Sequence, residues 1–356
     1  MKTINSRISS MGLRNYVQKI FTSIGIAERD AETISDSLVA ANLRGVDSHG
    51  VSRVPIYLER FTSNLVNTSF DIEVQNETAT SALIDGKNSH GILVAQKAIE
   101  MAVEKAKVAG IAIIGVKESN HCGMLAYYSK YAVDHDCIAI ITSNASPSMA
   151  PWGGRERYFG TNPLCYGIPV NEDSNIIFDM ATSVVARGKI RLAAKHGKSI
   201  PDNWALTRDG EYTTDPLEAL EGLVLPFGGP KGNGLVTLID ILSGVMTGAN
   251  FGSHAGAITD EGKQGLGHTF IVIKADLFLS LDQFKNRMEQ MIKEIKMIKK
   301  MKGIDRIYLP GEIEQELEER NKEFGIPLDP LTCKELENIG EKFNLNMLDY
   351  LEYTAR

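Results

Sequence analysis

The sequence predicts an α/β fold with helical segments on both sides of the α/β centre. Between Leu13 and Leu43, apolar residues recur at spacings of three and four, which is the period of one helix face. After Asn76, short β-branched runs alternate with helical stretches, a texture typical of α/β proteins. Beyond a turn-rich connection at residues 207–216, glycine-rich segments alternate with an apolar and an amphipathic helix.

The individual elements follow from these local patterns. In the N-terminal part, residues 27–41 form an amphipathic helix rich in good helix formers. In the centre, helices are predicted at 92–109 and 124–133. Helices are also predicted at 235–246 and 282–301, with a glycine-rich loop at 252–267 between them. Five strands are predicted, at residues 81–86, 111–117, 137–144, 164–170 and 175–180.

Boundaries near residues 75 and 220 divide the chain into three segments. Residues 1–75 are the first segment of a mainly helical domain, and residues 76–220 are an α/β domain. Residues 221–356 are predicted to return to the N-terminal helices, so that the first and third segments form one discontinuous helical domain. The charged tail after about residue 315 is predicted to be helical.

Composition excludes several classes of function. The chain has 356 residues and a formal net charge of −7, with no basic block, so we expect no nucleic-acid partner. No run approaches the roughly 18 apolar residues of a membrane span, and the start lacks a signal-peptide core. The four cysteines form no C-x-x-C pair and no histidine pair has the H-E-x-x-H spacing, so neither a disulfide framework nor a metal site is predicted. These features predict a cytoplasmic protein.

The stretch "RGVDSHGVSRVPIYLERF" is the first candidate site. In a helix that begins near Ser48 or Ser52, the residues His49, Arg53 and Tyr57 lie at i, i+4 and i+8 on one face. Arginine can bind a carboxylate through two parallel hydrogen bonds, and histidine can exchange a proton near neutral pH. The pattern suits a hydroxy-acid site. The alternative is a solvated helix start in which Arg53 pairs with an acid such as Glu59, and a glycine and a proline argue against a straight helix.

The stretch "KESNHCGMLAYY" is the second candidate site. His121 lies just after a predicted strand and just before a predicted helix, where active residues of α/β folds gather. It is therefore a candidate acid/base. The alternatives are a histidine that satisfies backbone groups of the loop, or a Cys122 nucleophile with a histidine partner.

The stretch "LPFGGPKGNGLVTLIDILSG" is a candidate anion site. Its glycines precede a helix, whose free amides favour an anion, and Lys231 adds positive charge. Close helix packing permitted by glycine is the alternative. The segment is no P-loop, and the chain has no G-x-G-x-x-G fingerprint after a strand. Asp179, at the end of "NIIFD", could accept ribose hydroxyls or cap the helix after it.

Six motifs that follow one another along the chain together resemble the malate/L-lactate dehydrogenase family that is distinct from the Rossmann-type enzymes, and the resemblance runs from about residue 10 to about residue 315. They are "RGVDSHGVSRVPIYLERF", "SNHCG", "PWGGRERYFGTNPLCYGIP", "FDMATS", "GGPKGNGLVTLIDILSG" and "YLPGE". The resemblance implies a nicotinamide-binding α/β domain with a fold of its own, which accounts for the missing fingerprint. It also implies a homodimer.

The resemblance further implies roles for individual residues. His121 is the acid/base and His49 a second polar group near the reacting centre, although which of the two histidines transfers the proton stays open. Arg53 clamps the substrate carboxylate, with Tyr57 and Ser48 beside it in the substrate pocket. Asn233 and Pro230 depart from the common form of the lysine motif. The implied cofactor-binding residues are Asp179, Met180, Ala181, Lys231, Gly311 and Glu312.

These features predict an NAD(P)-dependent oxidoreductase that interconverts a 2-hydroxy acid and a 2-oxo acid, with malate and oxaloacetate as the leading pair. Ureidoglycolate and L-lactate are alternative substrates. NAD is favoured over NADP because Asp179 near a ribose would repel a 2′-phosphate. A hypothesis of another class is a nucleotide-binding module without catalysis, which would bind NADH but not consume it with any 2-oxo acid.

Overall fold

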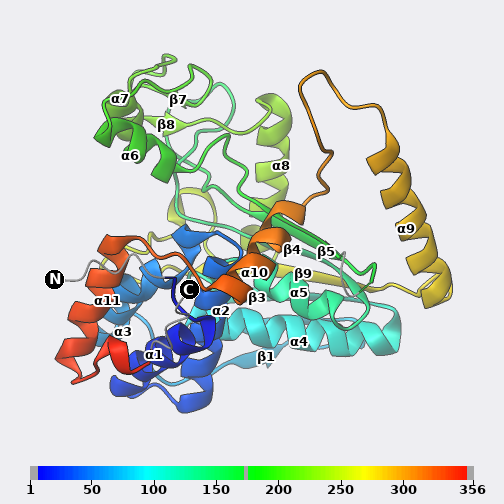
Figure 1. Ribbon diagram of the computed structural model, residues 1–356, viewed down its shortest axis with the longest axis horizontal. Coiled ribbons are helices and arrows are strands. Elements are labelled where there is room, and N and C mark those ends of the chain that lie inside the picture. Colours follow the sequence, from blue (N-terminus) through cyan, green and yellow to red (C-terminus); the bar gives the residue numbers. More distant parts are fainter. Residues whose placement is uncertain (1–6, 172–174, 351–356) are drawn as a thin grey trace.

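A seven-stranded mixed sheet in the order β1-β2-β3-β9-β4-β5-β6 forms the centre of the computed structural model, which describes residues 7–171 and 175–350 (Figure 1). β2 and β3 run parallel, and the other neighbouring strands run antiparallel. All five predicted strands are confirmed. The strands are β1 (Glu73–Gln75), β2 (Ser81–Asp85), β3 (Ile111–Ser119), β4 (Cys137–Ser143), β5 (Leu164–Ile168), β6 (Ile176–Met180) and β9 (Leu266–Lys274).

The strand β9 comes from the part of the chain after residue 220 and pairs with both β3 and β4. The predictions do not include it, although "TFIVIK" at residues 269–274 has the β-branched composition of a strand. The division into segments 1–75, 76–220 and 221–356 stays a prediction.

The two faces of the sheet are covered by different helices. α4 (Gly91–Ala109) and α5 (Ala126–Val133), both predicted, lie with the buried side chains of β3 and β4 in one hydrophobic core. Successive strand residues point to opposite faces, so Ile114 faces α4 while Gly115 faces away. A Cβ on Gly115 would lie 3.1 Å from the Thr247 side chain, so the chain around residue 247 covers the other face.

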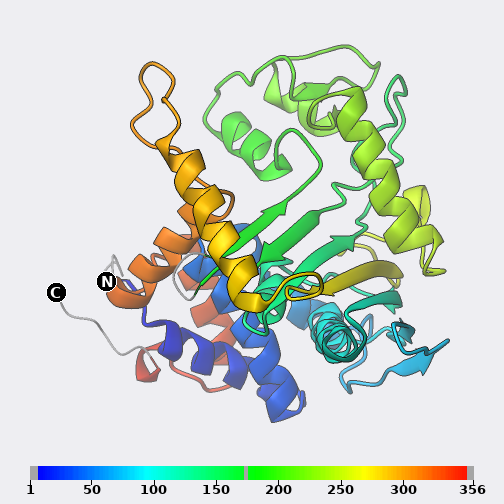
Figure 2. The ribbon, with the colours of Figure 1, turned by 90° about the vertical axis from the view of Figure 1, so that its right-hand side faces the viewer.

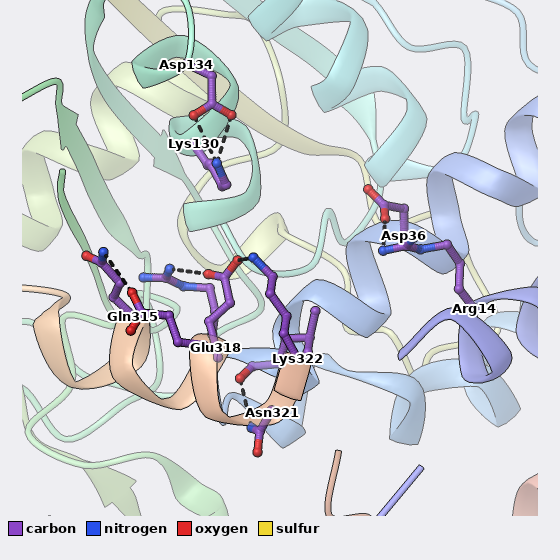
Figure 3. Close-up of polar contacts among 11 residues, drawn as sticks. Arg14, Asp36, Lys130, Asp134, Gln315, Glu318, Asn321 and Lys322 are labelled. Carbon is purple, nitrogen blue, oxygen red and sulfur yellow. Dashed lines mark hydrogen bonds and ion pairs between the residues drawn. The ribbon is translucent and has the colours of Figure 1, made fainter. Parts of the chain in front are cut away.

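A second core is built by helices from both ends of the chain. α1 (Ser10–Ser23), α2 (Glu28–Leu43) and α3 (Val54–Thr62) pack with α11 (Pro330–Lys342), and the Tyr16 hydroxyl donates to the Leu336 carbonyl at 2.9 Å. α10 (Glu312–Phe324) is held on α2 by the Asn321 side-chain amide, which donates to the Leu43 carbonyl at 2.9 Å. Figure 3 shows Asn321 beside the Glu318–Lys322 ion pair. The predicted helical tail is confirmed.

A smaller lobe with its own core lies between β6 and α8 and does not appear among the predicted elements. It contains α6 (Arg187–Lys195), α7 (Pro216–Glu221) and the short pair β7 (Ala205–Leu206) and β8 (Leu223–Val224). α8 (Pro230–Asp240) follows and continues into a π-helical turn at Ile241–Val245. The predicted helix at 235–246 is therefore present, but it begins five residues earlier and changes its winding after Asp240.

The predicted amphipathic helix is also present, as α9 (Leu281–Met297). Ser280 and Gln283 form a capping box at its start. None of its residues is buried, and the helix runs along the outside of the molecule (Figure 2). Its apolar side chains are mostly partly buried, so the chain itself covers this face only in part. Over the described ranges, no helix is long and apolar enough to cross a membrane.

Candidate active site

A cavity of about 610 Å³ brings together most of the predicted site residues. It lies between the helical core, the loop after β3, the end of β6 and the start of α10, so four parts of the chain that are distant in sequence line it. Its wall contains Ser48, His49, Arg53, His121, Asp179, Met180, Ala181 and Gly311.

The first candidate stretch is not one straight helix, as its glycine and its proline indicated. Two 3₁₀ turns, Asp47–His49 and Val51–Arg53, are separated by Gly50 in an extended conformation, and α3 begins only at Val54. The Asn42 side chain causes the break, because its Oδ1 accepts the Val51 amide at 2.8 Å. A Cβ on Gly50 would lie 2.2 Å from that same oxygen, so only glycine fits there.

Despite this break, His49, Arg53 and Tyr57 remain on the same side of the chain as His121. The His49 ring stacks on the His121 ring with centroids 5.5 Å apart. The Tyr57 hydroxyl forms a hydrogen bond of 2.7 Å with Nδ1 of His121. The Ser48 hydroxyl lies 3.0 Å from Nδ1 of His49. Both candidate stretches therefore form one site.

Arg53 presents its guanidinium to the cavity. Its Nε donates to the Ser48 carbonyl at 2.6 Å, and its two terminal nitrogens have no hydrogen-bond partner within residues 7–171 and 175–350. The alternative pairing with Glu59 is not formed. A guanidinium fixed at Nε with its other edge free can bind a carboxylate through two parallel hydrogen bonds.

The histidines of the site are held neutral at pH 7. Burial, with the positive charge of Arg53 as the next cause, holds the pKa of His121 well below its usual 6.5. The same two causes lower the pKa of His49 to about 4. Burial raises the pKa of Tyr57 above its usual value, so its hydroxyl stays protonated.

This arrangement makes His121 a base at a defined atom. In the tautomer that donates Nδ1–H to the Tyr57 oxygen, the other ring nitrogen, Nε2, carries a free lone pair. That nitrogen can accept a proton from a hydroxyl group in the cavity, and the imidazolium so formed keeps its hydrogen bond to Tyr57. The tyrosine thus orients the ring in both protonation states.

Asp179 lies on the cavity wall at the end of β6. Its Oδ2 accepts the Ala126 amide at 2.8 Å and so caps α5, not the helix that follows it in the chain. Burial raises the pKa of Asp179 to about 6, while the hydrogen bond from Ala126 and the charge of Arg44 act in the opposite direction. Its cofactor role stays a prediction.

Two predicted cofactor residues do not line this cavity. Lys231 is exposed in the first turn of α8. Glu312 accepts hydrogen bonds from Lys296 at 2.6 Å, from Arg306 and from the Leu309 amide at 2.8 Å. Partial burial raises the pKa of Glu312, but these hydrogen bonds have the larger effect and lower the pKa to about 2. Glu312 therefore fixes the start of α10, and the cofactor roles of both residues stay predictions.

Two residues of the site were missed. Gln264 is buried, lines the cavity and accepts the His121 amide on its Oε1 at 3.0 Å. Nothing in the sequence of its glycine-rich loop marks it. Arg44 also lines the cavity and pairs with Glu318 at 2.9 Å. Arg44 is the first residue of the first candidate stretch, so that motif could have identified it as a site residue.

The alternative of a Cys122 nucleophile is not supported. Its Sγ is buried 3.8 Å from Nδ1 of His268, and burial raises the pKa of the thiol to about 12. A thiol with such a pKa is not the reactive thiolate. Among the described side chains, no group of three or more His, Cys, Asp or Glu could hold a metal ion.

The lowered pKa of a buried histidine also predicts how the stability of the fold depends on pH. Burial lowers the pKa of His90 to about 3, against 6.5 for an exposed histidine. Below pH 6.5 the unfolded chain therefore binds a proton that the folded chain does not, so stability falls as pH drops from 6.5 toward the folded-state pKa. We expect the urea midpoint to decrease between pH 7 and pH 5 by less in His90→Asn than in the wild type.

Asparagine suits this test because His90 accepts the Ile92 amide at the start of α4, a capping role that asparagine can take. The folded His90→Asn protein should therefore keep α4 while it loses one titrating group. An identical loss of stability in the two proteins would contradict the assignment of this pH dependence to His90.

Known proteins similar to this chain match it over most of its length. A family model described as malate/L-lactate dehydrogenase matches residues 8–337. The malate/(S)-sulfolactate dehydrogenase of Methanothermus fervidus is 38% identical over 94% of this chain and 97% of its own length. The ureidoglycolate dehydrogenase (NAD(+)) of Escherichia coli K12 is 34% identical over 88% of this chain and 90% of its own length.

A solved structure agrees over the whole architecture. Sulfolactate dehydrogenase from Methanocaldococcus jannaschii has a TM-score of 0.92 and 35% sequence identity, over 97% of this chain and 99% of that chain. The predicted non-Rossmann α/β fold is confirmed by this likeness.

Proposed function

The chain belongs to the malate/L-lactate dehydrogenase family, and from this premise we propose that it interconverts malate and oxaloacetate with NAD. It is a hydroxy acid dehydrogenase. The observation that carries the proposal is the joint placement of His121, whose ring Tyr57 orients from behind the cavity wall, and of the free edge of Arg53 on one cavity.

In the proposed reaction, Arg53 binds the substrate carboxylate and turns the C2 hydroxyl toward His121. Nε2 of His121 removes the hydroxyl proton while the C2–H bond breaks, which leaves a carbonyl at C2. The nicotinamide ring, when bound, supplies the acceptor for the hydride. In the reverse direction the His121 imidazolium returns the proton to the carbonyl oxygen, and Tyr57 holds the ring throughout.

The cavity also suits the proposed cofactor. It continues from His121 to the Asp179–Ala181 strand end and to Gly311, so it extends well beyond the space that a small acid fills. Arg44 lines it and has a buried Nε without a hydrogen-bond partner among the described atoms. Asp179, Met180, Ala181 and Gly311 would hold the cofactor. We favour NAD because the Asp179 carboxylate would repel a 2′-phosphate; NADP is the alternative.

A panel of 2-oxo acids tests the choice of substrate. NADH or NADPH would be mixed with oxaloacetate, pyruvate or sulfopyruvate, and ureidoglycolate with NAD or NADP. The proposal requires the highest kcat/KM for oxaloacetate with NADH. Sulfopyruvate is the second candidate, because the similar enzymes from M. fervidus and M. jannaschii carry sulfolactate in their names. A higher kcat/KM for any other acid would overturn malate as the substrate.

A further part of the proposal is a cytoplasmic homodimer. The four cysteines are buried and unpaired, as in a reducing compartment. Leu238, Ile241 and Val245 form an exposed apolar row along α8 and its π-helical turn, and about half of each side chain is exposed. A second copy of the chain would cover this row and the apolar face of α9. Sedimentation velocity tests it, and a monomer at micromolar concentration would refute it.

The depressed pKa of His121 predicts the pH profile of the proposed reaction. Oxidation needs the neutral ring, and the free enzyme holds the pKa of His121 well below 6.5. We therefore expect kcat/KM for malate to remain constant as the pH falls through 6.5 and to decline only at lower pH. An inflection near pH 6.5 would show that the base is a histidine of ordinary pKa.

A further inference from the structure

A loop at residues 256–264 is tied to α3 by a single buried arginine. Arg60 is 2% exposed. Its Nη1 donates to the carbonyls of Ile258 and Asp260 at 3.0 Å each, and its Nη2 donates to the Gly262 carbonyl at 2.8 Å. Three carbonyl oxygens of one loop therefore surround one guanidinium.

The loop itself is closed at its base. The Gly256 amide donates to the Gln264 carbonyl at 2.9 Å, and the Gln264 side-chain amide returns a longer bond of 3.4 Å to the Gly256 carbonyl. Near the tip, the Ala257 amide donates to the Asp260 carboxylate at 2.7 Å. Because its ends are joined, the loop can be held against α3 as a unit by the bonds to Arg60.

This loop reaches the site at two points. Ile258 lines the cavity and packs against the helical core. The Gln264 Oε1 accepts the His121 amide at 3.0 Å. Tyr57, which binds the His121 ring, lies one turn before Arg60 on α3. The backbone and the ring of His121 are therefore held by a loop and a helix that Arg60 joins.

We propose that Arg60 is a positioning residue that holds the 256–264 loop against α3. In this position of the loop, Gln264 fixes His121, and Ile258 closes the end of the cavity at which the substrate binds. The kinetic part of this inference rests on the proposed function. If the loop lifted, the buried guanidinium would lose all three acceptors at once, so the loop stays closed in the wild type.

The variants Arg60→Met and Arg60→Lys separate this role from a general effect on folding. Methionine keeps most of the side-chain length without any donor, and lysine keeps the charge but loses the planar fork. Arg320→Met, on the exposed face of α10, is the matched control. Circular dichroism and thermal melting establish whether each protein is folded. If Arg60→Met does not fold, Arg60→Lys is compared with the wild type instead.

Limited trypsin digestion reads the loop directly, because Lys263 is exposed within it. We expect cleavage after Lys263, identified by mass spectrometry, to be at least about tenfold faster in Arg60→Met than in the wild type, with Arg60→Lys between them. Lys263→Gln removes the cleavage site and confirms the assignment of the fragment. The control Arg320→Met should be cleaved at the wild-type rate.

The kinetic test compares the change in KM for the substrate with the change in the dissociation constant of the cofactor. We expect Arg60→Met to raise KM for the best 2-oxo acid by at least about tenfold, with the NADH dissociation constant unchanged. Wild-type rates of cleavage after Lys263, or an unchanged KM, in a folded Arg60→Met protein would overturn the inference. If the wild type reduced no 2-oxo acid while cleavage followed the expected order, the proposed function would fail and the attachment of the loop would stand.

Discussion

Replacing His121 with asparagine is expected to lower kcat for malate oxidation by about 10²- to 10⁴-fold, the usual contribution of a positioned general acid or base. Asparagine fills similar space and can still hydrogen-bond to Tyr57, but it cannot take up the hydroxyl proton at neutral pH. The fold and the NADH dissociation constant should change little. Single-turnover rates are the appropriate measurement, because slow product release would otherwise hide the effect.

His49→Asn is the matched control, since the two rings are stacked and both line the cavity. The geometry favours His121 as the base, because the buried Tyr57 hydroxyl fixes its Nδ1 at 2.7 Å, whereas Nδ1 of His49 contacts an exposed hydroxyl, that of Ser48, at 3.0 Å. We expect the His49 variant to keep a larger part of kcat. Normal turnover by His121→Asn, together with an inactive His49→Asn, would reverse the two roles.

The second large effect is expected at Arg53. In Arg53→Lys the ammonium cannot reproduce the two parallel hydrogen bonds of the guanidinium, so KM for the 2-oxo acid should rise about ten- to a hundredfold. Loss of the Nε bond to the Ser48 carbonyl would add to this, because that bond fixes the direction of the side chain. Initial rates over a range of substrate concentrations give KM.

NADH affinity, measured by fluorescence titration, is the control for Arg53→Lys, because Arg53 contacts the substrate in this account and not the cofactor. The NADH dissociation constant should stay within about twofold of the wild type. An unaltered KM for the best 2-oxo acid would remove the carboxylate-clamp role from Arg53.

The sequence was sufficient for the local elements and for most of the site because both have short-range signals. The short β-branched run "CIAIITSN" identifies β4, and the motif around His49 and Arg53 identifies one wall of the cavity. His121 was placed correctly beyond the end of a strand. In each case the relevant residues lie within a few positions of one another.

What the sequence did not reveal depends on contacts between distant segments. The break at Gly50 is set by the Asn42 side chain, whose contact with that backbone cannot be inferred from helical spacing. The bond between Gln264 and His121 joins residues 143 positions apart. Likewise, Asp179 caps α5 because β6 lies beside that helix, whereas the sequence suggested a cap for the helix that follows. Such pairings arise only when the sheet assembles.

The central claim is that the chain transfers a hydride from C2 of a 2-hydroxy acid to a nicotinamide. It is tested most directly by incubating the enzyme with NAD and malate that carries deuterium at C2, and then measuring the mass of the reduced cofactor. The account predicts one deuterium in each NADH formed, together with oxaloacetate. Binding of NAD without any deuterated NADH from malate or the other hydroxy acids of the family would contradict the account and would leave a nucleotide-binding module.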